Sequence, residues 1–264
     1  MEYIYRYGLE FNPFIKGKKD LIIETSEYKE VIYRLNYLLK TKGFGLLTGA
    51  PGRGKTTIIR SFVKSLNTSL YKVIYSPLST LTVIEFYRNL AMQLELEPQF
   101  RKSDNFKIIQ AELTRYAVEK RITPVIIIDE ANYINNGILN DLKLLFNFNM
   151  DSINRAVVLL VGLPQINNTL RLVAHEPLRQ RITMNYNLDG LSKEEAKNYI
   201  LEMLKEAKSH VTVFSENALE AIVNAGNGIP RIINKICDVI GHNRDIDEIN
   251  ADIVMMAVDD IELR

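Results

Sequence analysis

A glycine-rich loop constrains this chain more than any other feature. Residues 49–56 read Gly-Ala-Pro-Gly-Arg-Gly-Lys-Thr, a complete G-x-x-x-x-G-K-[ST] pattern between a predicted strand and a predicted helix. Backbone N–H groups of such a loop surround phosphate oxygens, and the helix N-terminus adds positive potential. We expect Lys55 to reach the β- and γ-phosphates of a nucleotide and Thr56 to ligate Mg²⁺. The residues expected to contact the nucleotide are Gly49, Ala50, Pro51, Gly52, Arg53, Gly54, Lys55, Thr56 and Thr57.

A second motif ends another apolar strand. Residues 125–128 are a run of Val and Ile, followed by Asp129 and Glu130. We expect Asp129 to hold Mg²⁺, directly or through water, and Glu130 to polarise the attacking water as a general base. The alternative is a pair of solvated carboxylates at the end of a strand. If the motif is functional, Glu130 favours hydrolysis over a passive nucleotide switch.

Strand and helix patterns alternate along the first part of the chain, which predicts an α/β fold with a parallel five-stranded sheet. The predicted strands are residues 43–48, 71–76, 125–128, 156–161 and 182–188; the predicted helices are residues 56–66, 81–96, 105–119 and 138–148. After Gly190 only helical periodicity follows, and Ser192 with Glu195 predicts a capping box. We expect helices at residues 192–207, 215–225, 230–241 and 250–260. The predicted domains are therefore 1–189, which binds nucleotide, and 190–264, which is all-α.

Composition sets limits on the protein class. With 47% hydrophobic and 25% charged residues among 264, the chain has an ordinary globular balance. No apolar run approaches the roughly 20 residues that span a bilayer, and the first residues show no signal peptide, so we expect a cytoplasmic protein without a membrane segment. Three histidines (His175, His210 and His242) share no metal-ligand spacing with the single cysteine, Cys237, which we place in the core.

With these motifs placed, the chain resembles AAA+ ATPases of the ExeA/TniB group. That group joins general secretion pathway protein A ATPases with transposon target-selection ATPases akin to phage Mu transposition protein B. Besides the two motifs above, the resemblance rests on Gly8-Leu9, Asn12-Pro13-Phe14, Val161-Gly162-Leu163-Pro164, Leu178-Arg179-Gln180-Arg181-Ile182, Gly190-Leu191-Ser192-Lys193-Glu194-Glu195 and Gly228-Ile229-Pro230-Arg231-Ile232-Ile233-Asn234. It implies a P-loop AAA+ domain followed by a helical lid, and ATP with Mg²⁺ as the bound species.

The resemblance also assigns roles to residues outside the two motifs. Asn12, Pro13 and Phe14 would line the adenine pocket, or plug the core, or both. Arg231 would be the sensor-2 arginine that reaches the γ-phosphate, or a helix-surface arginine. Arg179 or Arg181 would be the arginine finger offered to the next subunit, with Arg181 favoured.

Two further positions of the family pattern are ambiguous in this chain. Sensor 1 is the poorest match, because Leu163 stands where relatives often have a polar residue; Gln165 is the substitute, or the function is lost. Asn132 either bridges the active site to a DNA-facing loop or caps a helix.

Charge divides the chain unevenly. Residues 190–264 carry 8 Lys+Arg and 14 Asp+Glu, a net charge of −6, which leaves 25 and 18, a net charge of +7, for residues 1–189. In the connector between two predicted helices, Arg101, Lys102 and Lys107 are candidate contacts to DNA phosphates, although a solvated loop is the favoured explanation. Tyr3, Tyr5 and Tyr7 are candidates for base stacking, or for packing of the N-terminal segment.

Three functions remain open at this point. The favoured one is a transposition regulator that oligomerises as a ring or filament on duplex DNA, selects the target and recruits a transposase. It rests on the basic first region and on a sequence that stops at Arg264, directly after the predicted lid. The alternatives are a secretion-pathway assembly ATPase and a nucleotide-dependent scaffold. Glu130 and the arginine candidates argue against a scaffold that does not hydrolyse nucleotide.

Overall fold

The chain folds into two compact units. The computed structural model describes residues 4, 7–15, 17, 21–77, 80–150, 152–209, 213–241 and 249–262. One unit, the helical unit, comprises Met1–Lys29, Gly52–Gly54 and Asp189–Arg264; the other, the α/β unit, comprises Glu30–Pro51 and Lys55–Leu188. The C-terminal part of the helical unit begins where the sequence predicts the domain boundary. Residues 1–29, expected in the nucleotide-binding domain, group instead with the helical unit.

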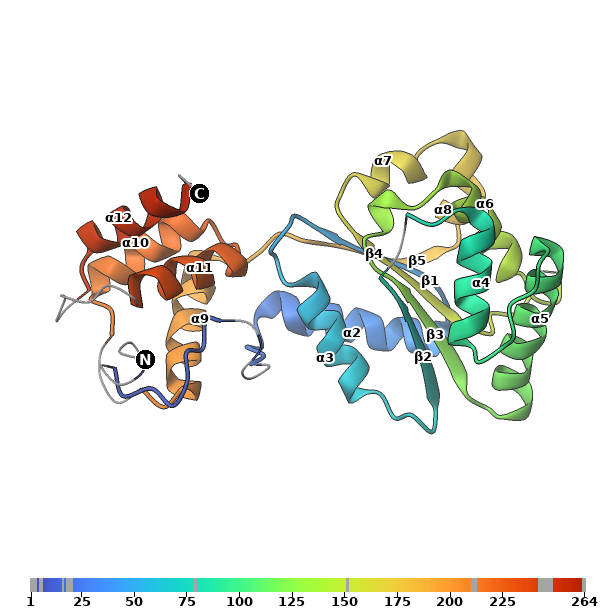
Figure 1. Ribbon diagram of the computed structural model, residues 1–264, viewed down its shortest axis with the longest axis horizontal. Coiled ribbons are helices and arrows are strands. Elements are labelled where there is room, and N and C mark those ends of the chain that lie inside the picture. Colours follow the sequence, from blue (N-terminus) through green and yellow to red (C-terminus); the bar gives the residue numbers. More distant parts are fainter. Residues whose placement is uncertain are drawn as a thin grey trace. The chain divides into compact units, whose positions relative to one another are not determined.

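The α/β unit is built on one parallel sheet of five strands in the order β2-β3-β4-β1-β5 (Figure 1). The strands are β1 (Gly43–Gly49), β2 (Tyr71–Ser76), β3 (Thr123–Ile128), β4 (Val157–Gly162) and β5 (Ile182–Leu188). The predicted fold class and strand number are therefore confirmed. Strands β1 and β4 are buried along their whole length, as expected for parallel strands covered on both faces.

One face of the sheet supports the main core of the α/β unit. Phe44, Leu46, Ile126, Val158 and Leu160 share this face and pack with buried side chains of three helices. These helices are α4 (Val83–Gln93), α5 (Lys102–Thr114) and α6 (Asn136–Leu145), which Figure 1 shows together on one side of the sheet. Helix α5 ends in a π-helical turn, η1 (Arg115–Glu119), where the sequence predicts a continuous α-helix.

The opposite face of the sheet is covered by α2 (Ser26–Thr41) and α3 (Lys55–Ser65) (Figure 1). Gly45 shows how closely α2 approaches, because a Cβ at this position would lie 2.5 Å from Cδ2 of Leu38. Helix α3 follows the glycine-rich loop directly and buries Ile58, Ile59 and Phe62. The positions of both β1 and α3 thus fix the two ends of the loop.

The remaining described elements of the α/β unit are short. They are η2 (Ala131–Tyr133), α7 (Ile166–Leu170), η3 (Val173–His175) and α8 (Glu176–Arg179). Element η2 directly follows the acidic end of β3, and α8 precedes β5. Both therefore lie in segments to which the sequence assigns functional residues.

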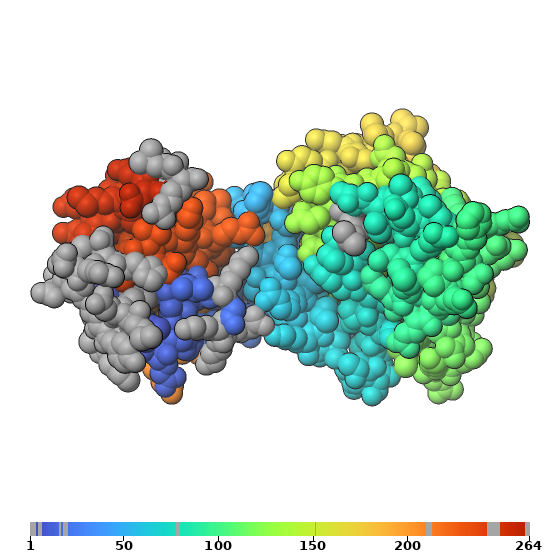
Figure 2. All heavy atoms as spheres, in the orientation of Figure 1, coloured from blue at the N-terminus to red at the C-terminus, as the bar shows by residue number. Residues whose placement is uncertain are grey.

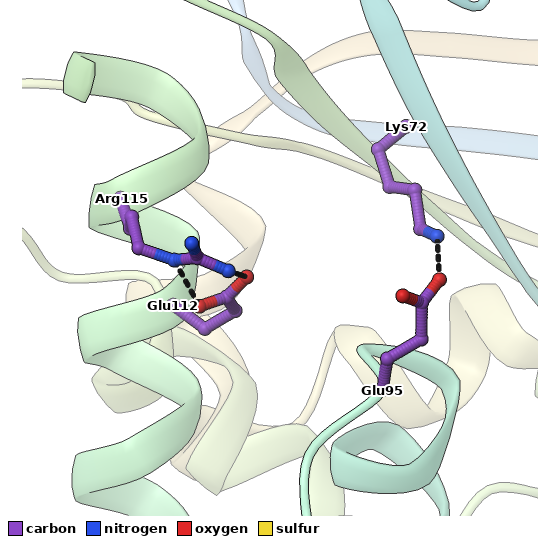
Figure 3. A network of polar contacts seen from close by, with 4 residues as sticks. All are labelled: Lys72, Glu95, Glu112 and Arg115. Carbon is purple, nitrogen blue, oxygen red and sulfur yellow. Dashed lines mark hydrogen bonds and ion pairs between the residues drawn. The ribbon is translucent and has the colours of Figure 1, made fainter. Parts of the chain in front are cut away.

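Two ion pairs lie close together where α4, α5 and β2 meet (Figure 3). Lys72 on β2 donates to Glu95 across 2.5 Å, and Arg115 forms a two-bond pair with Glu112 on α5, at 2.6 and 2.7 Å. The hydrogen bond to Glu95 raises the pKa of Lys72 above its usual 10.5. Since Glu95 and Arg115 are exposed, each pair contributes little to the free energy of unfolding.

The helical unit packs four helices and an N-terminal segment around one core. The helices are α9 (Lys193–Glu206), α10 (Glu216–Gly226), α11 (Pro230–Gly241) and α12 (Ala251–Glu262). Tyr7, Leu9 and Phe14 are buried in the same cluster as the inward side chains of these helices. Figure 2 shows the blue N-terminal segment lying against the orange and red helices. Cys237 is fully buried here, as expected from its place in the helical pattern.

The start of α9 is held by the predicted capping box. The Ser192 hydroxyl accepts from the backbone N–H of Glu195, and the Glu195 carboxylate accepts from that of Ser192. The same carboxylate also accepts from the backbone N–H of Ser26 at 2.9 Å. These bonds, chiefly those to Ser26, lower the pKa of Glu195 from 4.5 to about 2. Glu195 therefore joins the N-terminal segment to the first helix of the C-terminal part.

Candidate nucleotide-binding site

The glycine-rich loop has the backbone geometry of a phosphate cradle. Gly52 and Gly54 have φ of 81° and 94°, a region that residues with a Cβ rarely adopt. Lys55 is buried at the start of α3, where its ammonium donates to the carbonyls of Gly49 at 2.7 Å and Ala50 at 3.1 Å. The lysine thus bridges back over its own loop, which holds a positive charge where phosphate oxygens would lie.

The other loop residues flank this cradle. Pro51, Thr56 and Thr57 are exposed, and both threonines lie in the first turn of α3. Gly49 must be a glycine because its added Cβ would lie 2.9 Å from Cβ of Leu188 on β5. Its close approach to β5 holds the loop's first residue in place.

Asp129 is a buried carboxylate that accepts three hydrogen bonds. It is 5% exposed, and its Oδ2 accepts from the Thr56 hydroxyl at 3.2 Å and from the Tyr75 hydroxyl at 2.8 Å. Its Oδ1 accepts from the backbone N–H of Glu130 at 2.9 Å. Carboxylate and hydroxyl oxygens are ligands that Mg²⁺ accepts, and the Thr56–Asp129 contact brings one of each together. The pair fits this ion.

Tyr75 is a site residue that the motifs do not identify. It is the last residue but one of β2 and lies in register with Ile127, so it shares a face of the sheet with Asp129. Burial, together with the hydrogen bond to Asp129, raises the pKa of Tyr75 from 10.0 to about 12. The phenol therefore remains a hydrogen-bond donor at any ordinary pH.

Glu130 adopts an unusual backbone conformation. Its φ is 51° and its ψ 37°, in the left-handed region that non-glycine residues adopt at some cost. The side chain is exposed, at the point where β3 gives way to η2. The two neighbouring carboxylates therefore differ in exposure: Asp129 is buried and Glu130 is exposed.

Asn132 braces the end of β4. Its Oδ1 accepts from the backbone N–H of Leu163 at 2.9 Å, and a Cβ on Gly162 would lie only 2.7 Å from that oxygen. The amide therefore fixes the acidic strand end to the end of β4 and does not cap a helix; its expected link to a DNA-facing loop stays a prediction. Of the sensor-1 candidates, Leu163 is partly buried and Gln165 is exposed.

The two arginine-finger candidates differ in their surroundings. Arg181 donates from Nη1 to the carbonyl of Lys143 at 2.6 Å, near the end of α6. Arg179, on α8, has a side chain 46% exposed, and its Nη2 lies 4.0 Å from Glu176. Arg181 is thus engaged within the α/β unit, whereas Arg179 extends from its surface.

In the helical unit, Arg231 lies against the loop residue Gly52. The backbone N–H of Arg231 donates to the Gly52 carbonyl at 3.3 Å, and a Cβ on Gly52 would lie 2.9 Å from Cβ of Arg231. Its side chain is exposed at the start of α11. Within the helical unit this arginine therefore lies beside Gly52; its expected role as the sensor-2 residue stays a prediction.

Arg53 and the N-terminal motif also belong to the helical unit. The Arg53 guanidinium packs against Gly190, where any Cβ would collide with it. Asn12 is 4% exposed, donates to Asp238 at 2.8 Å and accepts from the backbone N–H of Phe14 at 3.0 Å. Pro13 is buried between them. The motif packs into the helical core, in agreement with the core-plug alternative; its expected role at adenine stays a prediction.

The basic connector between α4 and α5 is held by hydrogen bonds of Asn105, which we expect to make it rigid. The Asn105 side chain is fully buried; it accepts from the Gln99 N–H and donates to the carbonyls of Gln99 and Arg101. Phe100, between them, is 86% exposed.

The three predicted phosphate contacts are not equivalent. Arg101 ends the connector, whereas Lys102 and Lys107 lie on α5. Arg101 and Lys107 are exposed. Lys102 instead forms a 2.5 Å ion pair with the largely buried Asp141 and lies 5.7 Å from the ring centre of Tyr87. Lys102 is thus part of the packing of α5 on α6. The exposed side chains of Arg101 and Lys107 are the better placed to meet a partner.

Comparison with known proteins identifies the family. A family model described as "AAA domain" matches residues 38–170, about half of the chain and most of the α/β unit. The chain belongs to this family. It is therefore an AAA+ ATPase by descent, and the expected family is confirmed.

Individual relatives of this AAA+ protein agree with that assignment. General secretion pathway protein A of Aeromonas hydrophila is 31% identical over 243 residues, which cover 89% of this chain and 44% of the relative. The chain thus spans less than half of that protein. The Aeropyrum pernix ORC2 protein (ADPNP-ADP complexes) matches with a TM-score of 0.68 and 20% identity over 95% of this chain and 71% of that one.

A third match is the Aeropyrum pernix ORC1 protein in complex with DNA, with a TM-score of 0.68 and 15% identity, covering 95% of this chain and 69% of that one. At such identities the two solved structures support the fold alone.

Among the described residues of this AAA+ protein, no helix is long and apolar enough to cross a membrane, and no cluster of three or more His, Cys, Asp or Glu could hold a metal. His210, His242, Tyr3 and Tyr5 lie outside the described residues.

Proposed function

We propose that this AAA+ protein hydrolyses ATP to ADP and phosphate in a Mg²⁺-dependent reaction. The observation that supports this most is the meeting of Thr56, the residue after the buried Lys55, with Asp129 at 3.2 Å. Lys55 would neutralise the β- and γ-phosphates, and the loop N–H groups would hold their oxygens. Bound Mg²⁺ would supply charge neutralisation at the β- and γ-oxygens, with Thr56 and Asp129 as its protein oxygens.

Glu130 is the proposed general base. It would accept a proton from the water that attacks the γ-phosphorus, while the bond to the β,γ-bridging oxygen breaks and ADP leaves. Its exposed side chain is accessible to water, in contrast to the buried Asp129. Asp129 keeps its hydrogen bonds to Thr56, Tyr75 and Glu130 and does not act as the base.

Phosphate release by the purified protein tests this proposal. Lys55→Ala should abolish ATP binding, and Glu130→Gln should retain ATP binding but lose hydrolysis by about 10²-fold or more. Glu97→Gln, an exposed carboxylate on the α4–α5 connector, is the matched control and should hydrolyse ATP at the wild-type rate. A Glu130→Gln protein that hydrolyses ATP as fast as the control would refute the base assignment.

We further propose a homo-oligomer in which Arg179 completes the site of a neighbouring subunit. The exposure of Arg179, and the engagement of Arg181 with Lys143, favour Arg179 over the arginine that the sequence favours. An arginine acting in trans contributes roughly 10³-fold or more to the rate, so hydrolysis per subunit should rise with protein concentration. Arg179→Ala should remove this rise without weakening ATP binding. A rate per subunit that stays flat from nanomolar to micromolar protein would refute it.

For the biological role, we propose an assembly ATPase of a secretion pathway. The support is the 31% identity to general secretion pathway protein A over 89% of this chain. The transposition role favoured by the sequence keeps one specific support, the exposure of Arg101 and Lys107 and of Phe100, which precedes Arg101.

Duplex-DNA binding with ATP, measured against salt, separates the two roles. In a transposition ATPase, Arg101→Ala with Lys107→Ala should reduce the slope of log K against log salt by about 0.9 for each lost phosphate contact. Lys40→Ala, an exposed lysine on α2, is the control for general charge loss. Absence of DNA binding at low salt would leave the secretion role in place and end the transposition role.

A further inference from the structure

Tyr75 connects an edge strand of the sheet to the carboxylate of Asp129. Its residue exposure is 40%, so the ring is partly open to solvent while the hydroxyl points to Oδ2 of Asp129 at 2.8 Å. The register of β2 with β3 pairs Tyr75 with Ile127 and thereby brings it to the same face as Asp129, the face covered by α3. No motif in the sequence assigns this tyrosine a role.

The hydrogen bonds around Asp129 restrict its carboxylate to one orientation. Oδ1 is held by the Glu130 N–H at 2.9 Å, and Oδ2 by the hydroxyls of Thr56 and Tyr75. The Tyr75 bond is the shorter of the two hydroxyl bonds. Thr56 and Asp129 would hold the metal ion, and Tyr75 would then remain a hydrogen-bond donor to the carboxylate without being a ligand.

We propose that Tyr75 is a positioning residue that orients Asp129 for Mg²⁺. The inference rests on the proposed Mg²⁺-dependent ATPase activity and adds a determinant of its metal affinity. Groups that hydrogen-bond to a metal ligand typically change metal affinity or activity by about 10–100-fold when removed. Among the proposed site residues, Tyr75 is hydrogen-bonded only to the carboxylate of Asp129. The loss of its hydroxyl should therefore weaken the response to Mg²⁺ and leave metal-free ATP binding unchanged.

The test is a metal titration with a fluorescent ATP analogue followed by anisotropy. Binding is measured first in EDTA and then as Mg²⁺ is added, for the wild type and for Tyr75→Phe, which removes only the hydroxyl. We expect the Mg²⁺ concentration at half-effect to rise about 10-fold in Tyr75→Phe, with the EDTA affinity unchanged. Phosphate release against Mg²⁺ concentration should show the same displacement, with recovery at saturating Mg²⁺.

The chain supplies a matched control in Tyr71→Phe. Tyr71 lies on the same strand and the same face, four residues before Tyr75, and its hydroxyl has no hydrogen bond among the described residues. Its loss should leave the Mg²⁺ titration unchanged. A second comparison places Tyr75→Phe in an Asp129→Asn background. There it should have no further effect, because the residue acts through Asp129.

The outcomes separate this inference from the proposed function. A Tyr75→Phe titration that coincides with that of the wild type would overturn the positioning role while leaving the ATPase proposal standing. An equal displacement in Tyr71→Phe, or an undiminished effect in the Asp129→Asn background, would also overturn it, since either would indicate a general effect on the strand. The proposed function would instead be refuted if the wild-type protein bound no ATP, or if its rate of ATP hydrolysis did not depend on the Mg²⁺ concentration.

Discussion

The ion pair between Lys102 and Asp141 should make a measurable contribution to the stability of the α/β unit. Asp141 is 7% exposed and lies on α6, and Lys102 begins α5. The two side chains meet at 2.5 Å. Lys102→Ala would leave a largely buried carboxylate without its cation, next to the fully buried ring of Tyr87.

The expected loss follows from how much of the pair is buried. Removing one partner of a buried ion pair costs about 3–5 kcal/mol, whereas exposed pairs are worth about 0.2–1 kcal/mol. The side chain of Asp141 is 10% exposed and that of Lys102 is 49% exposed, so this pair lies between the two cases. We expect Lys102→Ala to reduce the free energy of unfolding by about 2 kcal/mol and the Tm by about 4–8 °C.

A double-mutant cycle measures the interaction directly. Urea unfolding is followed for Lys102→Ala, Asp141→Asn and the double variant. Because Asp141→Asn removes the charge that Lys102 neutralises, the double variant should be more stable than the sum of the single losses predicts, by about 1 kcal/mol. Arg101→Ala, next in sequence and exposed, should change stability by less than about 0.5 kcal/mol.

Additive losses within about 0.3 kcal/mol, or equal stability of Lys102→Ala and Arg101→Ala, would refute this reasoning. The result also decides how DNA binding can be tested. If Lys102→Ala destabilises the α/β unit, its effect on DNA affinity cannot be assigned to a phosphate contact. Arg101 and Lys107 then remain the informative positions.

Three further predictions concern structure and stability. Because the pKa of Glu195 is lowered to about 2, its contribution to stability is complete above pH 4.5 and lost as pH falls toward 2; urea unfolding of Glu195→Gln should lack that acid-dependent loss. Gly162→Ala should lower the free energy of unfolding by about 1–3 kcal/mol in thermal melts, since the new Cβ meets Asn132 at 2.7 Å. Asn105→Ala removes three hydrogen bonds and should speed amide hydrogen exchange at Gln99; unchanged exchange would contradict the proposed rigidity of the connector.

Local patterns were sufficient to predict the sheet, because β1, β3 and β4 are largely apolar segments, and β5, with β2 in part, alternates apolar with polar residues. Helix α2 was not predicted. Its buried positions, Val31, Leu35, Leu38 and Leu39, follow helical spacing, but the exposed Tyr33 and Tyr37 interrupt the polar face. The apolar spacing there is as regular as in α3 and α4, so this helix could have been predicted from the sequence.

The candidate site was predictable only where its residues are adjacent in sequence. The glycine-rich loop and the acidic strand end are continuous motifs. Tyr75 is separated from Asp129 by 54 positions and reaches it through strand register, which the sequence does not reveal. Asn132 likewise acts on the end of β4, 31 positions away. The grouping of residues 1–29 with the helical unit depends on long-range packing of the same kind.

The buried Cys237 gives the helical unit a built-in reporter of its own opening. It is the single thiol of the chain, it is fully buried in the middle of α11, and burial raises its pKa far above the usual 9.0. A thiol reagent can therefore reach it as a thiolate only when α11 separates from its neighbours. Timed alkylation of the unmodified protein, with and without nucleotide, would follow the transient unfolding of this one unit without any introduced label.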